Sequence, residues 1–313
     1  MNIVVVGSGM SGLMASRLLV SQGHTVTVFD KGRGVGGRLA TRRIGEGVFD
    51  HGAQFFTVRE PEFESHVREW IDNGVVREWC RGFGPDQDGY PRYVGSAGMT
   101  SIAKYLAQGL DVRQSSLVFS VLPENSGWRT TLDDGSSTVS DVVVLTCPIA
   151  QSFGYAFTAG IEMPEDLRSI DYDRTLGLLA LLDQPLSVPS PGAVQNPDDT
   201  FSFVGDNMAK GISPVPAATF HANPAWSLAH WDTPHDEAEA LLTELARPYL
   251  GHARILSSNY KRWRFATPQR TWPERHWMND AGNFVIAGDA FAGPRIEGAA
   301  MSGLSAARAV LSR

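Results

Sequence analysis

Residues 1–38 read MNIVVVGSGMSGLMASRLLVSQGHTVTVFDKGRGVGGR, and this stretch decides the fold. Residues 3–6 are an unbroken run of β-branched side chains, which is typical of a parallel strand covered on both faces. Gly7, Gly9 and Gly12 follow with the spacing G-x-G-x-x-G, and residues 10–21 are expected to form a helix. In this context the first glycine permits a tight turn, the second lets the backbone approach a pyrophosphate, and the third lets the helix pack on the strand.

The rest of the unit strengthens the prediction of a bound dinucleotide. Its phosphates are expected at the free N–H groups of the helix start, at Met10 and Ser11. A second strand over residues 25–29 ends at Asp30, at the distance where an acidic side chain accepts hydrogen bonds from ribose hydroxyls. A glycine-rich turn without a ligand is the alternative. NAD and FAD both use this cradle, so the unit alone leaves the choice between them open.

Composition limits the class of protein. The chain has 313 residues and a net charge of -7, which argues against a nucleic-acid partner. Its two cysteines, Cys80 and Cys147, make neither a disulfide framework nor a metal site, so a reducing compartment is expected. No apolar run reaches the length of a membrane span, and we therefore expect a soluble, cytoplasmic protein without a membrane partner.

A second glycine-rich loop follows Asp30 directly. It starts at Lys31 and is too rich in glycine to begin the helical crossover of an ordinary NAD domain. Gly36 and Gly37 would let the backbone lie against the ligand, while Arg38 donates to its pyrophosphate as a two-pronged donor. A mobile surface loop is the alternative interpretation.

Residues 49–57, FDHGAQFFT, place small residues and aromatics in a short segment that can run close to a flat group. From here the chain resembles the flavin amine-oxidase superfamily and, within it, the renalase family. The matching positions are Asp30-Lys31, Gly36-Gly37-Arg38, Asp50 and Gly52-Ala53-Gln54-Phe55. The resemblance implies that Ala53, Gln54 and Phe55 lie near a flavin ring, and that Val118, in a strand over residues 117–121, pairs with the adenine edge.

The resemblance returns near the C-terminus, in residues 283–303. A strand ending in Gly288-Asp289, a loop and a helix of small residues are similar to the third flavin motif of the superfamily. Asp289 is then expected to bond the ribityl hydroxyls, and the helix start at Gly298 and Ala299 to face the flavin ring with its positive end. Three motifs in the right order predict FAD, and the third contains no cysteine, so FAD is expected to be held non-covalently.

The fold class expected is α/β, with a Rossmann-like FAD-binding domain and a second, mixed α+β substrate domain, as in flavin amine oxidases and p-hydroxybenzoate hydroxylase. The FAD domain is expected to be discontinuous, over residues 1–60, 95–150 and 255–313. The substrate domain takes residues 61–94 and 151–254, where prolines cluster and strands become short. Helices are expected at 61–73, 100–108 and 234–250, and strands at 112–121, 139–146 and 175–182.

Candidate substrate contacts are less sharply marked. Aromatic side chains crowd the second half of the chain, as a pocket for a planar substrate requires. In the superfamily a glycine-methionine step also stands at the cavity edge. The candidates are Phe56, Thr57, Ser96, Ala97, Gly98, Met99, Trp231, Trp263 and Arg295.

The renalase resemblance implies oxidation of the 2- and 6-dihydro isomers of NAD(P), with O2 as acceptor and H2O2 as product. No side chain is expected to be catalytic, because hydride passes to flavin N5 and such a reaction needs alignment more than an acid or base. One alternative is an amine oxidase, which often keeps a lysine near the flavin. Only Lys210 and Lys261 could fill that role, and Lys210 lies in a loop-like stretch. The other is a non-oxidising flavoprotein, a mutase or a redox-sensing module.

Overall fold

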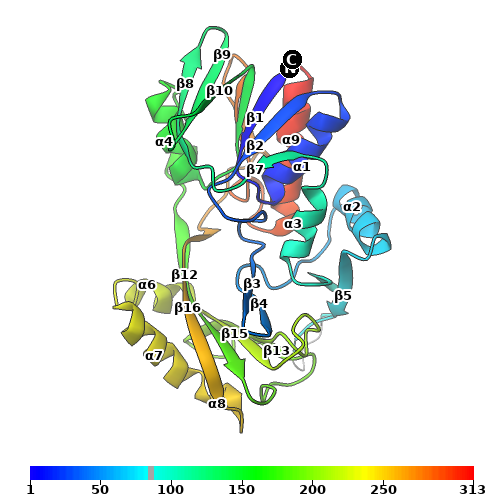
Figure 1. The fold of residues 1–313 in the computed structure, drawn as a ribbon, viewed down its shortest axis with the longest axis vertical. Coiled ribbons are helices and arrows are strands. Elements are labelled where there is room, and N and C mark those ends of the chain that lie inside the picture. The colour runs from blue at the N-terminus through cyan, green and yellow to red at the C-terminus, as the bar shows by residue number, and fades with distance from the viewer. Residues whose placement is uncertain (84–87) are drawn as a thin grey trace.

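The computed structural model describes residues 1–83 and 88–313, so residues 84–87 of the segment expected in the substrate domain lie outside the description. Figure 1 shows an upper body around β1 and a lower body around β12 and β16. The long strands β12 and β16 and the segment leading to the hairpin β3–β4 connect the two bodies. Both ends of the chain lie together at the top of the upper body.

The upper body is built on a mostly parallel sheet with the strand order β17-β18-β11-β1-β2-β7. β1 pairs in parallel with β2 on one side and with β11 on the other, as a nucleotide-binding α/β domain requires. Its β-branched residues are buried because helices cover one face and a small sheet the other. The bounds are β1 Asn2–Val6, β2 Thr25–Phe29, β7 Asp111–Arg113, β11 Val142–Leu145, β17 Trp277–Met278 and β18 Phe284–Ile286.

The helical face of this sheet depends on close approach between α1 and α9. A Cβ on Gly303 of α9 would lie 2.1 Å from the carbonyl oxygen of Ser11 in α1, so only glycine permits this packing distance. Two further helices, α2 and α3, join the apolar cluster on this side. The bounds are α1 Met10–Ser21, α2 Pro61–Asp72, α3 Thr100–Leu106 and α9 Ile296–Leu311.

The opposite face carries a three-stranded antiparallel sheet, β10-β9-β8, and two helices. Trp128 of β9 packs edge-on against Phe284 of β18, at 5.1 Å between ring centroids, and joins the two sheets. The bounds are β8 Val118–Glu124, β9 Gly127–Leu132, β10 Ser137–Ser140, α4 Ile149–Thr158 and α5 Glu165–Arg168.

The lower body is a large antiparallel sheet with the order β13-β14-β15-β12-β16. Alternate residues of β12 point to opposite faces. Leu176, Leu178 and Ala180 pack in the cluster covered by α6, α7 and α8, whereas Leu179 packs against Phe49 of the hairpin β3–β4. The strand bounds are β3 Thr41–Ile44, β4 Gly47–Asp50, β12 Tyr172–Leu182, β13 Ala193–Gln195, β14 Phe201–Asp206, β15 Ala217–Ala222 and β16 Ile255–Pro268; the helices are α6 Pro224–Ala229, α7 His235–Leu245 and α8 Arg247–Leu250. A separate pair is formed by β5 Val76–Cys80 and β6 Arg92–Gly95.

Several expected elements are divided in the structure. The helix expected over residues 234–250 is two helices, α7 and α8, because Pro248 has no N–H to continue the ladder. The strand expected over 112–121 is β7 followed by β8, with Ser115 at a positive φ of 52° between them. The strand expected over 139–146 is likewise β10 and β11.

The division of the chain at residue 255 does not match the pairing of strands. β16 begins there and pairs with β12 along nearly its whole length, so residues 255–268 belong to the large antiparallel sheet. Conversely α2, expected with the substrate domain, contributes Phe63 and Trp70 to the cluster that contains Leu13 of α1. The expected domain bounds remain a proposal that needs adjustment at these two places.

We expect the substitution Gly303→Ala to lower the free energy of unfolding by about 1–3 kcal/mol, because the added methyl group overpacks the contact between α1 and α9. Gly154→Ala, inside α4 and with open space around its Cβ position, is the matched control and should be neutral or slightly stabilising. Urea unfolding followed by tryptophan fluorescence measures both, and equal midpoints would contradict the packing argument.

Candidate active site

The three glycine segments converge in space. A Cβ on Gly37, which has a φ of 52°, would lie 3.7 Å from the Cα of Gly9, and the N–H of Gly36 donates to the carbonyl of Ser8 at 2.9 Å. The second loop therefore lies directly on the first turn. Gly288, with a φ of 149°, follows β18, which pairs with β11, and donates its N–H to the hydroxyl of Ser302 in α9 at 2.8 Å.

Arg38 and Asp289 join the second segment to the third. The guanidinium donates to both carboxylate oxygens, at 2.5 and 2.6 Å, in the planar two-bond geometry that arginine favours. Nη1 also donates to the backbone carbonyls of Phe265 and Ala266 in β16. Burial opposes the charge on Arg38, but the carboxylate of Asp289 more than offsets it and raises the arginine pKa above its ordinary value.

The first turn fits a dinucleotide phosphate. The hydroxyl of Ser11 is buried at the start of α1 without a hydrogen-bond partner in the described residues, and a Cβ on Gly9 would meet open space. Met10 is buried beside it. The carboxylate of Asp30 accepts from the N–H and the hydroxyl of Ser8, both at 2.6 Å, and from the N–H of Gly32 at 2.7 Å. A carboxylate has about four acceptor positions, so Asp30 retains capacity for a ribose hydroxyl.

The helix α9 begins beside this region. Gly298 and Ala299 lie in its first turn, where a Cβ on Gly298 would be 2.2 Å from the carbonyl oxygen of Gly293. Arg295, at the N-cap, is exposed and forms no ion pair with Glu297. The Glu297 carboxylate is buried and instead accepts from the backbone N–H groups of residues 59 and 60, at 2.7 and 2.8 Å.

The two remaining residues expected to bind the cofactor are Lys31 and Val118. Lys31 is exposed on the loop after β2. Val118 is buried at the start of β8, and its carbonyl oxygen accepts from the hydroxyl of Tyr155 at 2.8 Å. The pairing of Val118 with an adenine edge therefore stays a proposal.

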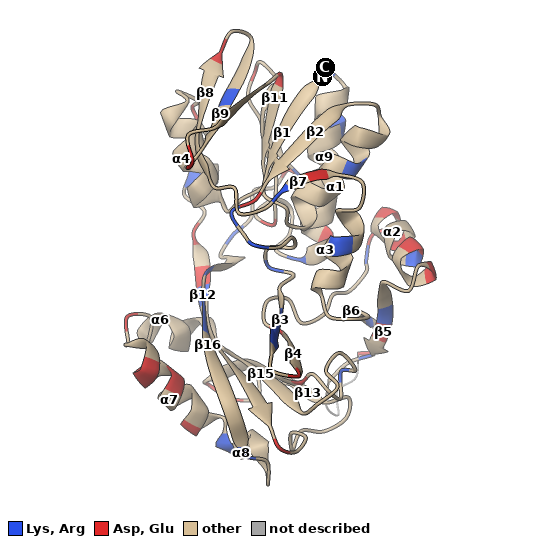
Figure 2. Cartoon of the chain, viewed as in Figure 1, with Lys and Arg blue, Asp and Glu red and all other residues tan. Residues whose placement is uncertain are grey.

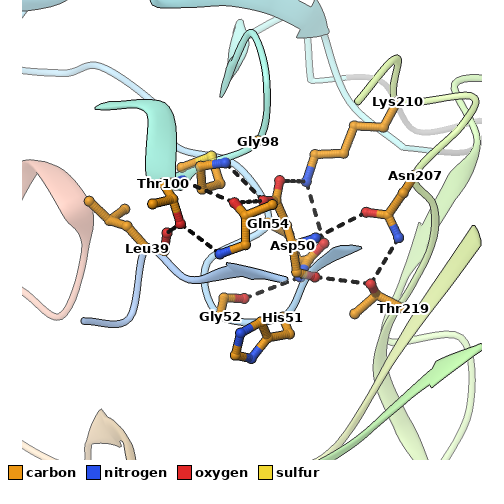
Figure 3. A network of polar contacts seen from close by, with 12 residues as sticks. Leu39, Asp50, His51, Gly52, Gln54, Gly98, Thr100, Asn207, Lys210 and Thr219 are labelled. Carbon is orange, nitrogen blue, oxygen red and sulfur yellow. Dashed lines mark hydrogen bonds and ion pairs between the residues drawn. The ribbon is translucent and has the colours of Figure 1, made fainter. Parts of the chain in front are cut away.

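Asp50, at the end of β4, is fully buried and is the centre of a polar network (Figure 3). One carboxylate oxygen accepts from the Thr41 hydroxyl at 2.6 Å and from the Met99 N–H at 2.8 Å. The other accepts from the Lys210 ammonium at 2.8 Å. Burial lowers the pKa of Lys210 from its ordinary value, and the charge of Asp50 limits that shift.

The same network fixes Gln54. Its amide oxygen accepts from Lys210 at 3.4 Å, and its amide nitrogen donates to the carbonyls of Asp50 and Gly52 at 2.7 and 3.2 Å. The Gln54 side chain is therefore occupied by protein contacts. Ala53 is held by an N–H bond to the carbonyl of Arg38 at 2.8 Å, which ties this segment to the second glycine loop.

An aromatic cluster lies beside Lys210. The Phe55 ring contacts Phe83 and Phe203, at centroid distances of 5.1 and 6.4 Å, and Trp79 contacts Phe83 at 5.3 Å. The Lys210 ammonium lies 5.3 Å from the centroid of the Trp79 ring, within the range of a cation–π contact.

His51 and Trp263 form a second aromatic surface. Figure 3 shows the ring of His51 on the side of the segment away from Lys210. Their rings stack at 5.4 Å, with 25° between the planes. The carbonyl oxygen of His51 accepts from the indole N–H of Trp263 at 2.7 Å and from Nε2 of His221 at 3.1 Å. Burial, assisted by nearby cations, lowers the pKa of His51 to about 3, and burial lowers that of His221 to about 4. Both rings are therefore neutral at pH 7.

The structure separates the other expected substrate residues. Phe56 is buried between Phe63 and Tyr93 in the core, with Thr57 after it, and Gly98 and Met99 pack beneath Asp50. Ser96 and Ala97 instead line a hollow of about 420 Å³ near Lys104 and Tyr105. Trp231 lies on the helix-covered face of the large antiparallel sheet, beneath Arg262, whereas Trp263 is on the opposite face. Trp231 and Trp263 thus cannot line one chamber.

Sequence reasoning missed the roles of Asp50, His51, Lys210 and His221. A signal was present, because Lys210 is one of only four lysines in a chain with 27 basic residues. Its position in a loop-like stretch argued against a role near the flavin, yet the loop turns inward and buries the Lys210 side chain.

Together, the nucleotide-type sheet, the converging glycine turns and the second antiparallel sheet define a two-domain, flavin-dependent oxidoreductase. The sequence profile described as "NAD(P)-binding Rossmann-like domain" matches residues 5–72, and that described as "Flavin containing amine oxidoreductase" matches residues 62–311. The chain belongs to the flavin containing amine oxidoreductase family, and this membership implies FAD as its cofactor.

Individual relatives agree with this assignment. Renalase of Mus musculus is 21% identical over 334 residues, covering 97% of this chain and 96% of renalase. An L-amino-acid oxidase of Echis ocellatus is 46% identical, but over only 22% of this chain and 14% of the oxidase. Among solved structures, putrescine oxidase bound to putrescine superposes with a TM-score of 0.73 at 15% identity, covering 100% of both chains.

No helix in residues 1–83 and 88–313 has the length and apolar character needed to cross a bilayer. Over the same ranges, no group of three or more His, Cys, Asp or Glu side chains is placed to hold a metal ion.

Replacing Lys210 by methionine should lower the free energy of unfolding by about 3–5 kcal/mol, because it leaves the Asp50 carboxylate buried and unpaired. The double variant Asp50→Asn/Lys210→Met removes both charges and should recover a large part of that loss. Urea unfolding of the FAD-loaded protein measures both effects. Equal destabilisation of the single and double variants would show that the ion pair is not the cause.

Stability should also fall in weak acid. The unfolded histidines titrate near pH 6.5, whereas His51 and His221 titrate at about 3 and 4 in the folded chain, so between these values only the unfolded state takes up their protons. Each histidine then lowers the free energy of unfolding by roughly 1.4 kcal/mol for each pH unit below 6.5. We expect His51→Asn and His221→Asn each to flatten the dependence of unfolding free energy on pH between 6 and 4.5. An unchanged slope in both variants would show that His51 and His221 are not held neutral in the folded protein over this pH range.

Proposed function

We propose that this protein is an oxidase of the 2- and 6-dihydro isomers of NAD(P), with FAD held non-covalently between the three glycine segments. The observation that carries the proposal is the stacked, neutral pair of His51 and Trp263 beside the segment that bears Gln54. Similarity to a renalase along nearly the whole chain supports it.

The residues expected to hold the cofactor are those that converge. The turn at Gly9 and Ser11 would receive the pyrophosphate, Asp30 the ribose, and the pair Arg38–Asp289 the pyrophosphate and ribityl groups. FAD held there would supply the redox chemistry: loss of a hydride would leave the substrate as NAD(P)+, and that hydride together with one proton from solvent would reduce O2 to H2O2.

The chain itself would contribute a rigid, water-excluding surface. Asp50 and Lys210 neutralise one another, and the carbonyl of His51 is fixed by two ring N–H donors, so the backbone of residues 50–54 cannot rotate freely. Alignment of a flat ring on a fixed surface is the contribution that hydride transfer needs most, since restoring the aromatic nicotinamide requires no proton to be removed.

Amine oxidation is the second candidate, and the position of Lys210 favours it. The ammonium is fully buried and touches Gln54, although the sequence places it in a loop. A non-oxidising flavoprotein remains the third possibility, and it would form no peroxide with any donor.

The FAD-loaded protein mixed with borohydride-treated NAD+, which contains all dihydro isomers, should consume the 2- and 6-dihydro forms and release one H2O2 for each. Chromatography of the isomers and a peroxide assay measure this outcome. Consumption of putrescine in place of the isomers would favour the amine oxidase, and no peroxide from the isomers would overturn the proposed function.

Trp263→Leu should lower kcat/KM for the isomers roughly tenfold, because it removes the stacked indole and its bond to His51. Trp231→Leu, on the opposite face of the same sheet, is the matched control and should leave kcat/KM within about twofold of the parent. An equal loss in the two variants would remove Trp263 from the substrate surface.

A further inference from the structure

One face of β16 leads from the expected flavin site into the lower body. The carbonyls of Phe265 and Ala266 accept from Arg38. The register of β16 is irregular between Thr267 and Trp263, but from Trp263 to Lys261 the pairing with β12 is regular, so these two side chains lie on one face, about 6.6 Å apart along the strand. Along the strand, Trp263 therefore lies between Lys261 and the contact with Arg38.

Lys261 has room on this face because its neighbour is a glycine. Gly177 of β12 pairs with Lys261 on one side and with His221 on the other. A Cβ on Gly177 would lie 3.8 Å from the Cβ of Lys261 and 3.5 Å from Cδ2 of His221. The lysine side chain thus stands on the same surface as the histidine whose ring holds the His51 carbonyl.

A second cation approaches from the hairpin. Arg42 of β3 pairs with Phe49 of β4, so their side chains share one side of the hairpin. Phe49 packs on Leu179, which is on the same face of β12 as Gly177. Arg42 and Lys261 therefore face a common space beside His51. Figure 2 marks the basic residues on both β3 and β16.

Neither cation is neutralised by the protein. Among residues 1–83 and 88–313, no carboxylate oxygen lies within 4.0 Å of a side-chain nitrogen of Arg42 or Lys261. Burial and the charge of Arg42 lower the pKa of Lys261, and both cations act on His51. Arg42 is exposed and Lys261 is partly buried, but these neighbouring like charges repel one another, and an anion between them would relieve the repulsion.

We propose that Arg42 and Lys261 form an anion subsite that binds the phosphate groups of the substrate while its flat ring lies against Trp263 and His51. The inference rests on the proposed function and deepens it, because it names the two residues that would hold the phosphate groups of the dinucleotide. A subsite of two cations selects against a protonated amine and favours a nucleotide.

The test uses the FAD-loaded full chain and two donors that share the reactive ring, 6-dihydro-NAD and the phosphate-free 6-dihydronicotinamide riboside. Arg42→Gln and Lys261→Gln should each lower kcat/KM for the dinucleotide about tenfold or more through KM, since a hydrogen bond to a charged group contributes about 1.5–3 kcal/mol. Activity on the riboside should change less than about twofold, and Lys261→Arg should retain most of the affinity for the dinucleotide.

The control is Arg43→Gln, the same charge change on the neighbouring residue, whose side chain leaves the opposite side of β3. It should not alter KM for either donor. Equilibrium titration with NAD+ and with inorganic pyrophosphate, read by tryptophan fluorescence, gives a measurement without turnover and should show the same loss in the Arg42 and Lys261 variants.

The outcomes separate the two proposals. If the parent protein oxidises neither donor, the proposed function is wrong, and unchanged pyrophosphate affinity in the Arg42 and Lys261 variants would then overturn the subsite as well. If the parent oxidises the dinucleotide and the riboside with equal KM, the function stands and the subsite is wrong. Equal loss on both donors in the glutamine variants would also overturn it, because that result indicates a general structural defect.

Discussion

The ion pair between Asp50 and Lys210 is the contact on which the arrangement of the two bodies depends. Asp50 ends the hairpin that leaves the upper body, and Lys210 comes from the loop that follows β14 in the lower body. Both are fully buried, and neither charge is tolerable there without the other. Asp50 also accepts from the N–H of Met99 and from the hydroxyl of Thr219, so the buried pair lies where two further segments meet the hairpin.

Because the pair lies at the base of the segment from Asp50 to Phe55, it determines the conformation of the strip expected beside the flavin. The Lys210 ammonium can only donate hydrogen bonds, so the amide oxygen of Gln54 must face it. The amide nitrogen of Gln54 then points the other way and donates to the carbonyls of Asp50 and Gly52. On the other side, the rings of His221 and Trp263 donate hydrogen bonds to the carbonyl oxygen of His51. Residues of the lower body therefore fix the conformation of the segment from Asp50 to Phe55 on both sides, although this segment follows the upper body in sequence.

The sequence predicted what local patterns encode. The parallel strands and α1 follow from β-branched runs and glycine spacing, and β1, β2 and α1 lie within one residue of their expected bounds. The hairpin β3–β4 and the length of β16 were not predicted, because their residues alternate poorly. β16 is stabilised by pairing with the distant strand β12, and the hairpin is stabilised by packing of Phe49 on Leu179 of β12. The roles of Lys210 and His221 depend on contacts with a segment some 160 residues away, and no local signal encodes such contacts.

The close contact between α1 and α9 has a consequence for how the protein is made. Ser11 and Gly303 meet backbone to backbone, and the apolar face of α1 is completed by Met301 and Leu304. Synthesis proceeds from the N-terminus at about 5–20 residues per second. The nucleotide-binding half therefore cannot finish folding when its first strands leave the ribosome, and it must keep an exposed apolar groove until α9 emerges.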